Sequence, residues 1–142
     1  MLRRAVLILA SMALVVVAFS GVALAVNKVG TFRPDTLIGT NQADRIYGLG
    51  AADRIAARAG NDDCYGGSGA DTIFCGTGND RIDGGFGEDE LHGQAGNDTI
   101  SAADGQRDLV NCGAGVDTAY VDELDDFAAN CENLFVAQQP PV

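Results

Sequence analysis

Residues 62–100 read DDCYGGSGA, DTIFCGTGN, DRIDGGFGE, DELHGQAGN and DTI when the chain is divided into units of nine. Each complete unit begins with aspartate, has an apolar residue two positions later and ends in a glycine-containing segment. The aspartates of the whole series are Asp35, Asp44, Asp53, Asp62, Asp71, Asp80, Asp89 and Asp98. A flexible glycine-rich linker would not hold aspartate and an apolar residue at fixed offsets, so this period predicts a repeat fold.

The three residues after each aspartate predict a very short β-strand. Triplets such as 72–74 (TIF) and 81–83 (RID) contain β-branched or aromatic residues and lie next to glycines. A unit of one strand and one turn cannot close on itself, so we expect two units per coil and alternating strands on two facing parallel sheets. The sequence therefore predicts an all-β fold, a two-sheet solenoid of nonapeptide repeats.

Units eighteen residues apart stack directly in such a solenoid, and the middle residue of each strand points inward. One inner ladder is expected to consist of Leu37, Ile55, Ile73 and Leu91. The facing ladder is expected to consist of Ile46, Cys64, Ile82 and Ile100. The residues expected to point outward include Arg45, Tyr47, Arg54, Tyr65, Phe74, Arg81, Glu90 and His92.

The turns between strands predict a cation site. Glycine lets the backbone enter conformations closed to other residues and point its carbonyl oxygens at one place. Stacking brings aspartates of successive coils about 5 Å apart, where two charges repel by roughly 3 kcal/mol at an effective dielectric constant near 20. We therefore expect a positive ion between them. Calcium suits this edge because it takes six to eight oxygen ligands in a tolerant geometry, whereas magnesium demands a tighter octahedron.

Aligned from the glycines, the unit is GGxGxDxUx, where U is a large apolar residue. Residues 66–73 (GGSGADTI) and 84–91 (GGFGEDEL) match it completely, while 75–82 and 93–100 lack one glycine each. This region resembles the calcium-binding nonapeptide repeats of the RTX, or haemolysin-type, family. The resemblance implies a parallel β-roll that binds calcium between its turns.

About four calcium sites are expected, between turns that end in Asp53 and Asp71, Asp62 and Asp80, Asp71 and Asp89, and Asp80 and Asp98. The carbonyl groups expected beside them belong to Gly67, Gly69, Gly76, Gly78, Gly85, Gly87 and Gly96. Asp35 and Asp44 follow turns with fewer glycines and are equally well interpreted as residues that cap their own turn. We expect the repeats to be largely disordered without calcium and to fold cooperatively upon binding it.

The N-terminal segment has the pattern of a secretory signal peptide. Arg3 and Arg4 precede an apolar stretch, residues 5–22, and Ala23-Leu24-Ala25 supplies a small-x-small cleavage site. An uncleaved membrane anchor is the alternative. Both interpretations predict a secreted protein or one associated with the cell surface. Without residues 1–25 the chain keeps seven basic and 20 acidic residues, a net charge of −13, which disfavours nucleic acid and membrane partners and favours multivalent cations.

The four cysteines predict up to two disulfides in an exported chain, with three connectivities open. We favour Cys64 with Cys75 and Cys112 with Cys131. Zinc is not expected, because there is no CxxC motif and His92 is the only histidine.

The repeat register slips after Ile100, although Asp108, Asp117 and Asp126 are again nine residues apart. Repeat arrays need an atypical end, so we expect a disulfide-linked cap with Asp117, Asp122 and Asp125 as further candidate ligands. The expected organisation is a signal-peptide helix (1–25), a short linker (26–34), the β-roll (35–106), the cap (107–136) and a disordered tail (137–142).

The sequence offers no enzymatic motif. It contains neither HExxH nor GxSxG, and the strict spacing of the carboxylates fits metal binding better than polysaccharide cleavage. A pore-forming toxin is not expected, because no membrane-active segment follows the signal. The remaining alternative is a cell-surface adhesion or matrix-interaction module, in which calcium rigidifies the chain and the outward residues contact a partner.

Overall fold

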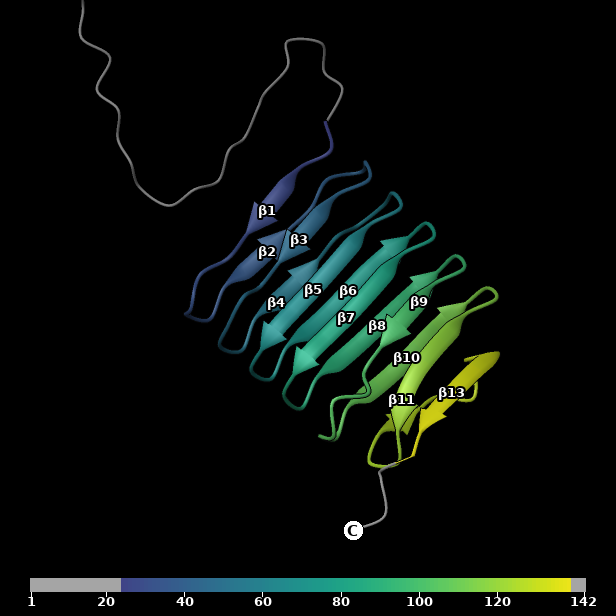
Figure 1. The fold of residues 1–142 in the computed structure, drawn as a ribbon. Helices are drawn as coiled ribbons and strands as arrows, with labels where there is room; N and C mark the ends of the chain where they lie inside the picture. Colours follow the sequence, from purple (N-terminus) through teal and green to yellow (C-terminus); the bar gives the residue numbers. More distant parts are fainter. Residues whose placement is uncertain (1–23, 139–142) are drawn as a thin grey trace, which may run out of the picture.

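The structure is a computed structural model that describes residues 24–138, and these form a single stack of parallel strands (Figure 1). In chain order the strands are β1 (Asn27–Val29), β2 (Thr36–Ile38), β3 (Arg45–Tyr47), β4 (Arg54–Ala56), β5 (Asp63–Ser68), β6 (Thr72–Thr77), β7 (Arg81–Phe86), β8 (Glu90–Ala95), β9 (Thr99–Ser101), β10 (Leu109–Ala114), β11 (Thr118–Asp122), β12 (Asp126–Phe127) and β13 (Asn133–Ala137).

Successive strands alternate between two sheets. The odd-numbered strands form one sheet in the order β1-β3-β5-β7-β9-β11-β13, which we call sheet A, and the even-numbered strands form sheet B in the order β12-β10-β8-β6-β4-β2. Neighbouring strands are parallel, and the chain makes one coil with each pair of units (Figure 1). The predicted two-sheet β-roll is confirmed.

The core lies between the sheets and consists of the two predicted ladders. Ile46 pairs with Cys64, which pairs with Ile82, while on the opposite sheet Leu37 pairs with Ile55 in the same manner. Apart from Leu37, which is 5% exposed, the ladder residues are at most 1% exposed. The C-terminal strands extend the core with Val110, Cys112, Ala119 and Val121.

One strand lies in the segment that we expected to be a linker. β1 pairs with β3, so that Lys28 occupies the inward register position opposite Ile46. Val26 stands where an aspartate would begin the unit, and its N–H donates to the Asp44 carboxylate at 2.7 Å. The sequence did not reveal this unit because valine and lysine replace its aspartate and its apolar residue.

Beyond Ile100 the coils continue with irregular unit lengths. The Asp108 N–H donates to the Asp125 carboxylate, seventeen residues on, at 2.9 Å, and the Asp117 N–H donates to the Glu132 carboxylate, fifteen residues on, at 2.9 Å. Asp125, one of the further candidate ligands, therefore continues the stacked aspartates, although Asp126 is the residue that keeps the nine-residue spacing. Asp126 is the first strand residue after the turn, and its exposed carboxylate forms an ion pair with Arg107.

The structure contains one of the two favoured disulfides. Cys112 and Cys131 are bonded, with a Cα–Cα distance of 5.3 Å. Cys64 and Cys75 are free thiols whose sulfurs lie 2.7 Å apart in the core, so the second expected bond is not formed. Both thiols are completely buried, and this burial raises the pKa of the Cys75 thiol well above its usual range, which disfavours the thiolate required for disulfide exchange.

The expected signal helix covers residues 1–25, of which residues 1–23 lie outside the described range. Residues 139–142 of the expected tail also lie outside it. Within residues 24–138 there is no helix long and apolar enough to cross a membrane.

Candidate metal centre

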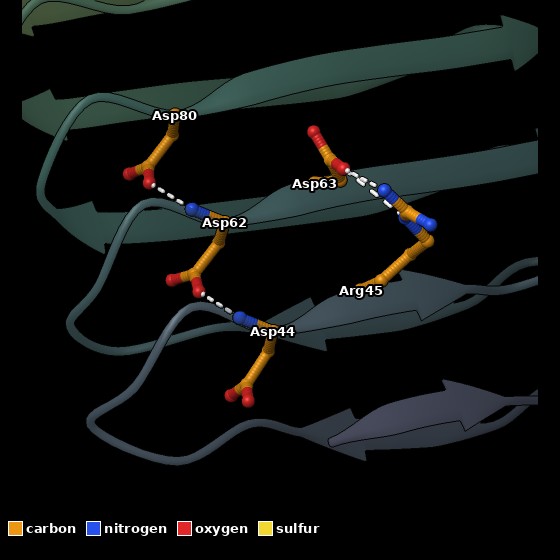
Figure 2. A network of polar contacts seen from close by, with 5 residues as sticks. All are labelled: Asp44, Arg45, Asp62, Asp63 and Asp80. Atoms are coloured by element: carbon orange, nitrogen blue, oxygen red, sulfur yellow. Dashed lines mark hydrogen bonds and ion pairs between the residues drawn. The ribbon is translucent and has the colours of Figure 1, made fainter. Parts of the chain in front are cut away.

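The repeated aspartates form two columns, one along each edge of the roll. In each column a carboxylate oxygen, Oδ1, accepts the backbone N–H of the aspartate one coil earlier. Figure 2 shows this for one edge, where the Asp44 N–H donates to Asp62 at 2.7 Å and the Asp62 N–H donates to Asp80 at 2.8 Å. On the other edge Asp53 donates to Asp71, and Asp71 donates to Asp89. Stacking of the coils thus brings the predicted aspartates together in order.

The Coulomb argument considered only the charges of successive carboxylates. In the structure a backbone N–H also lies between them and donates to one oxygen of each carboxylate. The N–H dipole partly offsets the charge of one oxygen of each carboxylate. The second oxygen is left to face other groups.

That second oxygen, Oδ2, is buried without a hydrogen-bond partner in eight aspartates. They are Asp53, Asp62, Asp71, Asp80, Asp89, Asp98, Asp108 and Asp117. Each of these residues is at most 3% exposed. A buried carboxylate oxygen without a partner is costly, so a row of eight in one small fold points to a missing positive partner.

Asp35 and Asp44 differ from the other aspartates. Oδ2 of Asp35 accepts the backbone N–H and the hydroxyl of Thr31 at 2.6 and 2.8 Å, and Asp44 accepts the same two groups from Thr40. A threonine stands here where the complete motif has glycine. These two aspartates cap their own turns and have no orphaned oxygen.

Two members of the row, Asp108 and Asp117, were outside the set of preferred ligands. The Asp89 N–H donates to Asp108 at 2.7 Å, and the Asp98 N–H donates to Asp117 at 2.8 Å. Asp108 follows a unit of ten residues, which breaks the nine-residue period. The segment 112–117 (CGAGVD) keeps most of the turn motif and was the available signal for Asp117.

The turn glycines direct their carbonyl oxygens along the axis of the roll. Gly67 and Gly69 have φ values of +112° and +125°, which L residues rarely adopt. A Cβ added to Gly85 would lie 2.0 Å from the Gly67 carbonyl oxygen, and one added to Gly87 would lie 1.9 Å from that of Gly69. Each of these carbonyls therefore points at the backbone of the next coil.

The remaining expected glycines share this arrangement. Gly76, Gly78 and Gly96 also have positive φ values, and a Cβ on any of them would lie within 1.8 Å of a carbonyl oxygen of the previous coil. Four other turn residues adopt positive φ without being glycine: Leu49, Ala51, Arg58 and Gln94. A positive φ at a non-glycine residue costs about 1–2 kcal/mol. The turns that contain these residues, before Asp53, Asp62 and Asp98, are therefore strained.

Burial raises the pKa of seven of the eight aspartates in the row. It raises the pKa of Asp71 and Asp89 to about 6 and that of Asp80 and Asp108 to about 7, opposed by the backbone N–H that each carboxylate accepts. Neighbouring carboxylates raise these pKa values further. The pKa values of Asp53, Asp62 and Asp98 are raised for the same first reason. The metal-free fold therefore keeps these carboxyls protonated to a higher pH than the unfolded chain does.

We predict that the metal-free protein is more stable in acid than at neutral pH. A carboxyl whose folded pKa lies above its ordinary value of about 3.9 stabilises the fold below that value, and this stability is lost as pH rises through the folded pKa, here about 6 to 7. Thermal unfolding of calcium-stripped protein between pH 4 and 8 should show a folded state in acid whose melting temperature falls as the pH rises, until no cooperative transition remains near neutral pH. A melting temperature that rises with pH would contradict this prediction.

The donor set suits calcium. Among residues 24–138 no group of three or more acidic, histidine or cysteine side chains converges on one point, so carboxylates alone do not complete a site. Backbone carbonyls of the turns lie close to the orphaned oxygens. In the turn before Asp71, for example, a Cβ on Gly66 would lie 2.5 Å from Asp71 Oδ2 and 2.4 Å from the Gly84 carbonyl oxygen. A mixed carboxylate and carbonyl set is typical of calcium.

Comparison with known proteins gave one family match. The family model described as RTX calcium-binding nonapeptide repeat (4 copies) matches overlapping stretches at residues 29–64, 38–73, 65–100, 74–109 and 89–119. These stretches cover every strand from β2 to β10 and contain the eight orphaned carboxylates. No curated protein and no solved structure was found to match the chain.

Proposed function

The chain belongs to the family of RTX calcium-binding nonapeptide repeats, and from this premise we propose that it is a secreted protein whose repeat region folds when calcium binds between stacked turns. The observation that carries the proposal is the row of eight buried carboxylate oxygens without partners. Calcium, when bound, supplies a positively charged partner for these carboxylate oxygens.

We assign the best sites to turns that combine an orphaned carboxylate oxygen with glycine carbonyls. These are the turns that end in Asp71, Asp80 and Asp89, together with those ending in Asp53, Asp62 and Asp98, which pair with them one coil away. The carbonyl ligands in this assignment come from Gly67, Gly69, Gly76, Gly78, Gly85, Gly87 and Gly96. Stacking gives about four sites, each shared by two successive coils.

The residues around each site have separate tasks. The aspartate Oδ1 and the N–H it accepts set the distance between coils, while Oδ2 remains available to the ion. Positive-φ glycines allow the turns to approach each other closely enough for carbonyls of two coils to share one ion. The apolar ladders exclude water from the inner side of the carboxylates.

Export is supported by the sequence of residues 1–25, with its two arginines, apolar stretch and small-x-small ending. Secretion places the chain where calcium is abundant, and the disulfide between Cys112 and Cys131 fits an oxidising compartment.

Calorimetric titration with calcium tests the proposed function. The protein without residues 1–25 should bind about four ions, and the heat should include that of coupled folding. Magnesium at the same concentrations should give no comparable heat, because it dehydrates reluctantly and demands octahedral geometry. Absence of saturable calcium binding would refute the proposal.

Asp80→Asn and Asp44→Asn form a matched pair of variants. Asp80→Asn keeps the oxygen that accepts the Asp62 N–H but removes the orphaned charge, so it should make the metal-free fold more stable and weaken calcium binding by at least about tenfold at the sites it joins. Asp44→Asn, whose carboxylate is already satisfied by Thr40, should leave calcium stoichiometry unchanged. Equal calcium titrations of the two variants would contradict the assignment.

A further inference from the structure

The outer face of sheet A carries one column of side chains that includes all three tyrosines of the chain. The strand register aligns Tyr47 with Tyr65 on β3 and β5, and Tyr120 with Phe135 on β11 and β13. Between these two pairs the same column contains only Asp83 on β7 and Ser101 on β9. The column is thus two aromatic stacks separated by two rows of small polar residues.

The rings in each stack lie face to face. The Tyr47 and Tyr65 rings are 4.8 Å apart with an interplanar angle of 7°, and those of Tyr120 and Phe135 are 5.1 Å apart at 17°. Because these spacings match the distance between neighbouring strands, the ring faces look along the axis of the roll. Tyr65 and Tyr120 therefore each turn one unstacked face toward the interval that Asp83 and Ser101 occupy.

The interval has a definite size. Tyr65 and Tyr120 are three strand spacings apart, which places their rings about 14 Å from each other at about 4.8 Å per strand. Two stacked layers fit between them at the spacing seen within the aromatic pairs. A hollow lies at the Tyr120 end of this interval, lined by Arg81, Ile82, Thr99, Ser101 and Tyr120.

The floor of the interval offers unused hydrogen-bonding groups. Arg81 and Thr99 flank Asp83 and Ser101 on the same strands. In the part of the chain that the structure describes, these four side chains make no hydrogen bond or ion pair with other protein groups, whereas Arg45 in the same sheet is paired with Asp63 at 2.9 Å. The floor thus presents a guanidinium group, a carboxylate and two hydroxyls to the solvent.

We propose that this interval on sheet A is a binding site for a neutral oligosaccharide, with one sugar ring against each of the facing tyrosines and with Arg81, Asp83, Thr99 and Ser101 bonded to its hydroxyls. A pyranose ring has an apolar face that packs on an aromatic ring and an equatorial rim of hydroxyls. The two tyrosine faces meet the first need, and the mixed donors and acceptors of the floor meet the second.

The charges on the chain favour a neutral sugar over other stacking ligands. Nucleic acid bases also stack on aromatic rings, but the 20 acidic residues against nine basic ones repel a polyphosphate. The same repulsion acts on polyuronic acids. A planar apolar ligand would leave Arg81 and Asp83 without partners, whereas hydroxyls can donate to the carboxylate and accept from the guanidinium.

Calcium-loaded full-length protein should be titrated with tetramers of β-1,4-linked glucose, N-acetylglucosamine and mannose. The chain has no tryptophan, so its emission comes from tyrosine, and two of its three tyrosines face the proposed site. At least one tetramer should change this emission saturably, and calorimetry should give the same dissociation constant. A tetramer of galacturonic acid should bind at least about tenfold more weakly than the best neutral one.

Three variants separate the site from nonspecific adsorption. Tyr65→Ala and Tyr120→Ala should each raise the calorimetric dissociation constant at least about tenfold. Phe74→Ala removes an outward ring stacked on His92 at 4.5 Å on the opposite sheet and should leave it unchanged. Far-UV circular dichroism in calcium verifies that each variant is folded. The proposal is overturned if no neutral tetramer binds below about 10 mM, or if Phe74→Ala weakens binding as much as the tyrosine variants do. A negative result here would leave calcium binding, measured separately, unaffected.

Discussion

Removal of calcium is expected to abolish most of the β-sheet circular dichroism signal of the protein. The eight orphaned carboxylate oxygens are buried and accept no hydrogen bond. Four sites held at a hundredfold excess of calcium over the dissociation constant contribute about 11 kcal/mol at about 2.7 kcal/mol each. This equals the whole stability of a typical domain, about 5–15 kcal/mol, so the metal-free fold should not persist at neutral pH.

Far-UV circular dichroism and size-exclusion chromatography of the same samples measure this effect. Excess chelator should remove the β signal and enlarge the hydrodynamic radius, and added calcium should restore both cooperatively. Magnesium at equal concentration is the control and should restore neither. A β signal that survives excess chelator at pH 7.5 would show that the backbone N–H groups alone satisfy the carboxylates.

Gly78→Ala is expected to destroy the central coils even in saturating calcium. Gly78 has φ +133°, and a Cβ there would lie 1.6 Å from the carbonyl oxygen of Gly60 in the previous coil. To relieve this clash, the backbones at Gly78 and Gly60 must move apart, which disturbs the hydrogen bonds that join the two coils there. We expect a loss of more than about 4 kcal/mol together with loss of the calcium site that contains the Gly78 carbonyl. Calcium-dependent thermal unfolding monitors both losses.

Gly50→Ala is the matched control, since it places the same methyl group in a turn on the other edge. Gly50 does not have positive φ, and its added Cβ would approach only side-chain atoms, Phe32 Cδ1 at 3.1 Å and Ser68 Oγ at 3.2 Å. Phe32 is 81% exposed and can move. The free energy of unfolding of the Gly50→Ala variant should differ from that of the unchanged protein by less than about 1 kcal/mol. Similar losses in the two variants would mean that glycine matters here through chain flexibility alone and not through contact between coils.

The fold could be predicted because its determinants repeat. A nine-residue period with one inward apolar residue leaves two units per coil as the way to bury every such residue, and the ladders of Leu37 and Ile46 followed from that alone. The period also placed the aspartates one coil apart. The repeat pattern missed β1, where Val26 and Lys28 replace the aspartate and the apolar residue of the unit.

The details of the site could not be predicted from spacing. Electrostatics required something positive between carboxylates, yet no sequence pattern distinguishes a metal ion from a backbone N–H in that place. In the last coils, seventeen residues separate Asp108 from its acceptor Asp125 in one column, and fifteen separate Asp117 from its acceptor Glu132 in the other. In these turns the N–H to carboxylate contact between coils is kept while the number of residues per coil changes, so the nine-residue period no longer predicts which residue is the acceptor.

The disulfide between Cys112 and Cys131 gives folding a starting point. It closes a loop of chain that contains Asp117 and Asp125, the acceptors for the N–H groups of Asp98 and Asp108. Such a crosslink restricts the unfolded chain by about 3 kcal/mol, so we expect the metal-free protein to keep this loop closed when the other coils separate. The N–H of each aspartate donates to the coil that follows it, and the crosslinked loop holds two of these acceptors close together. We therefore expect the roll to refold on addition of calcium from its C-terminal coils toward the N-terminus.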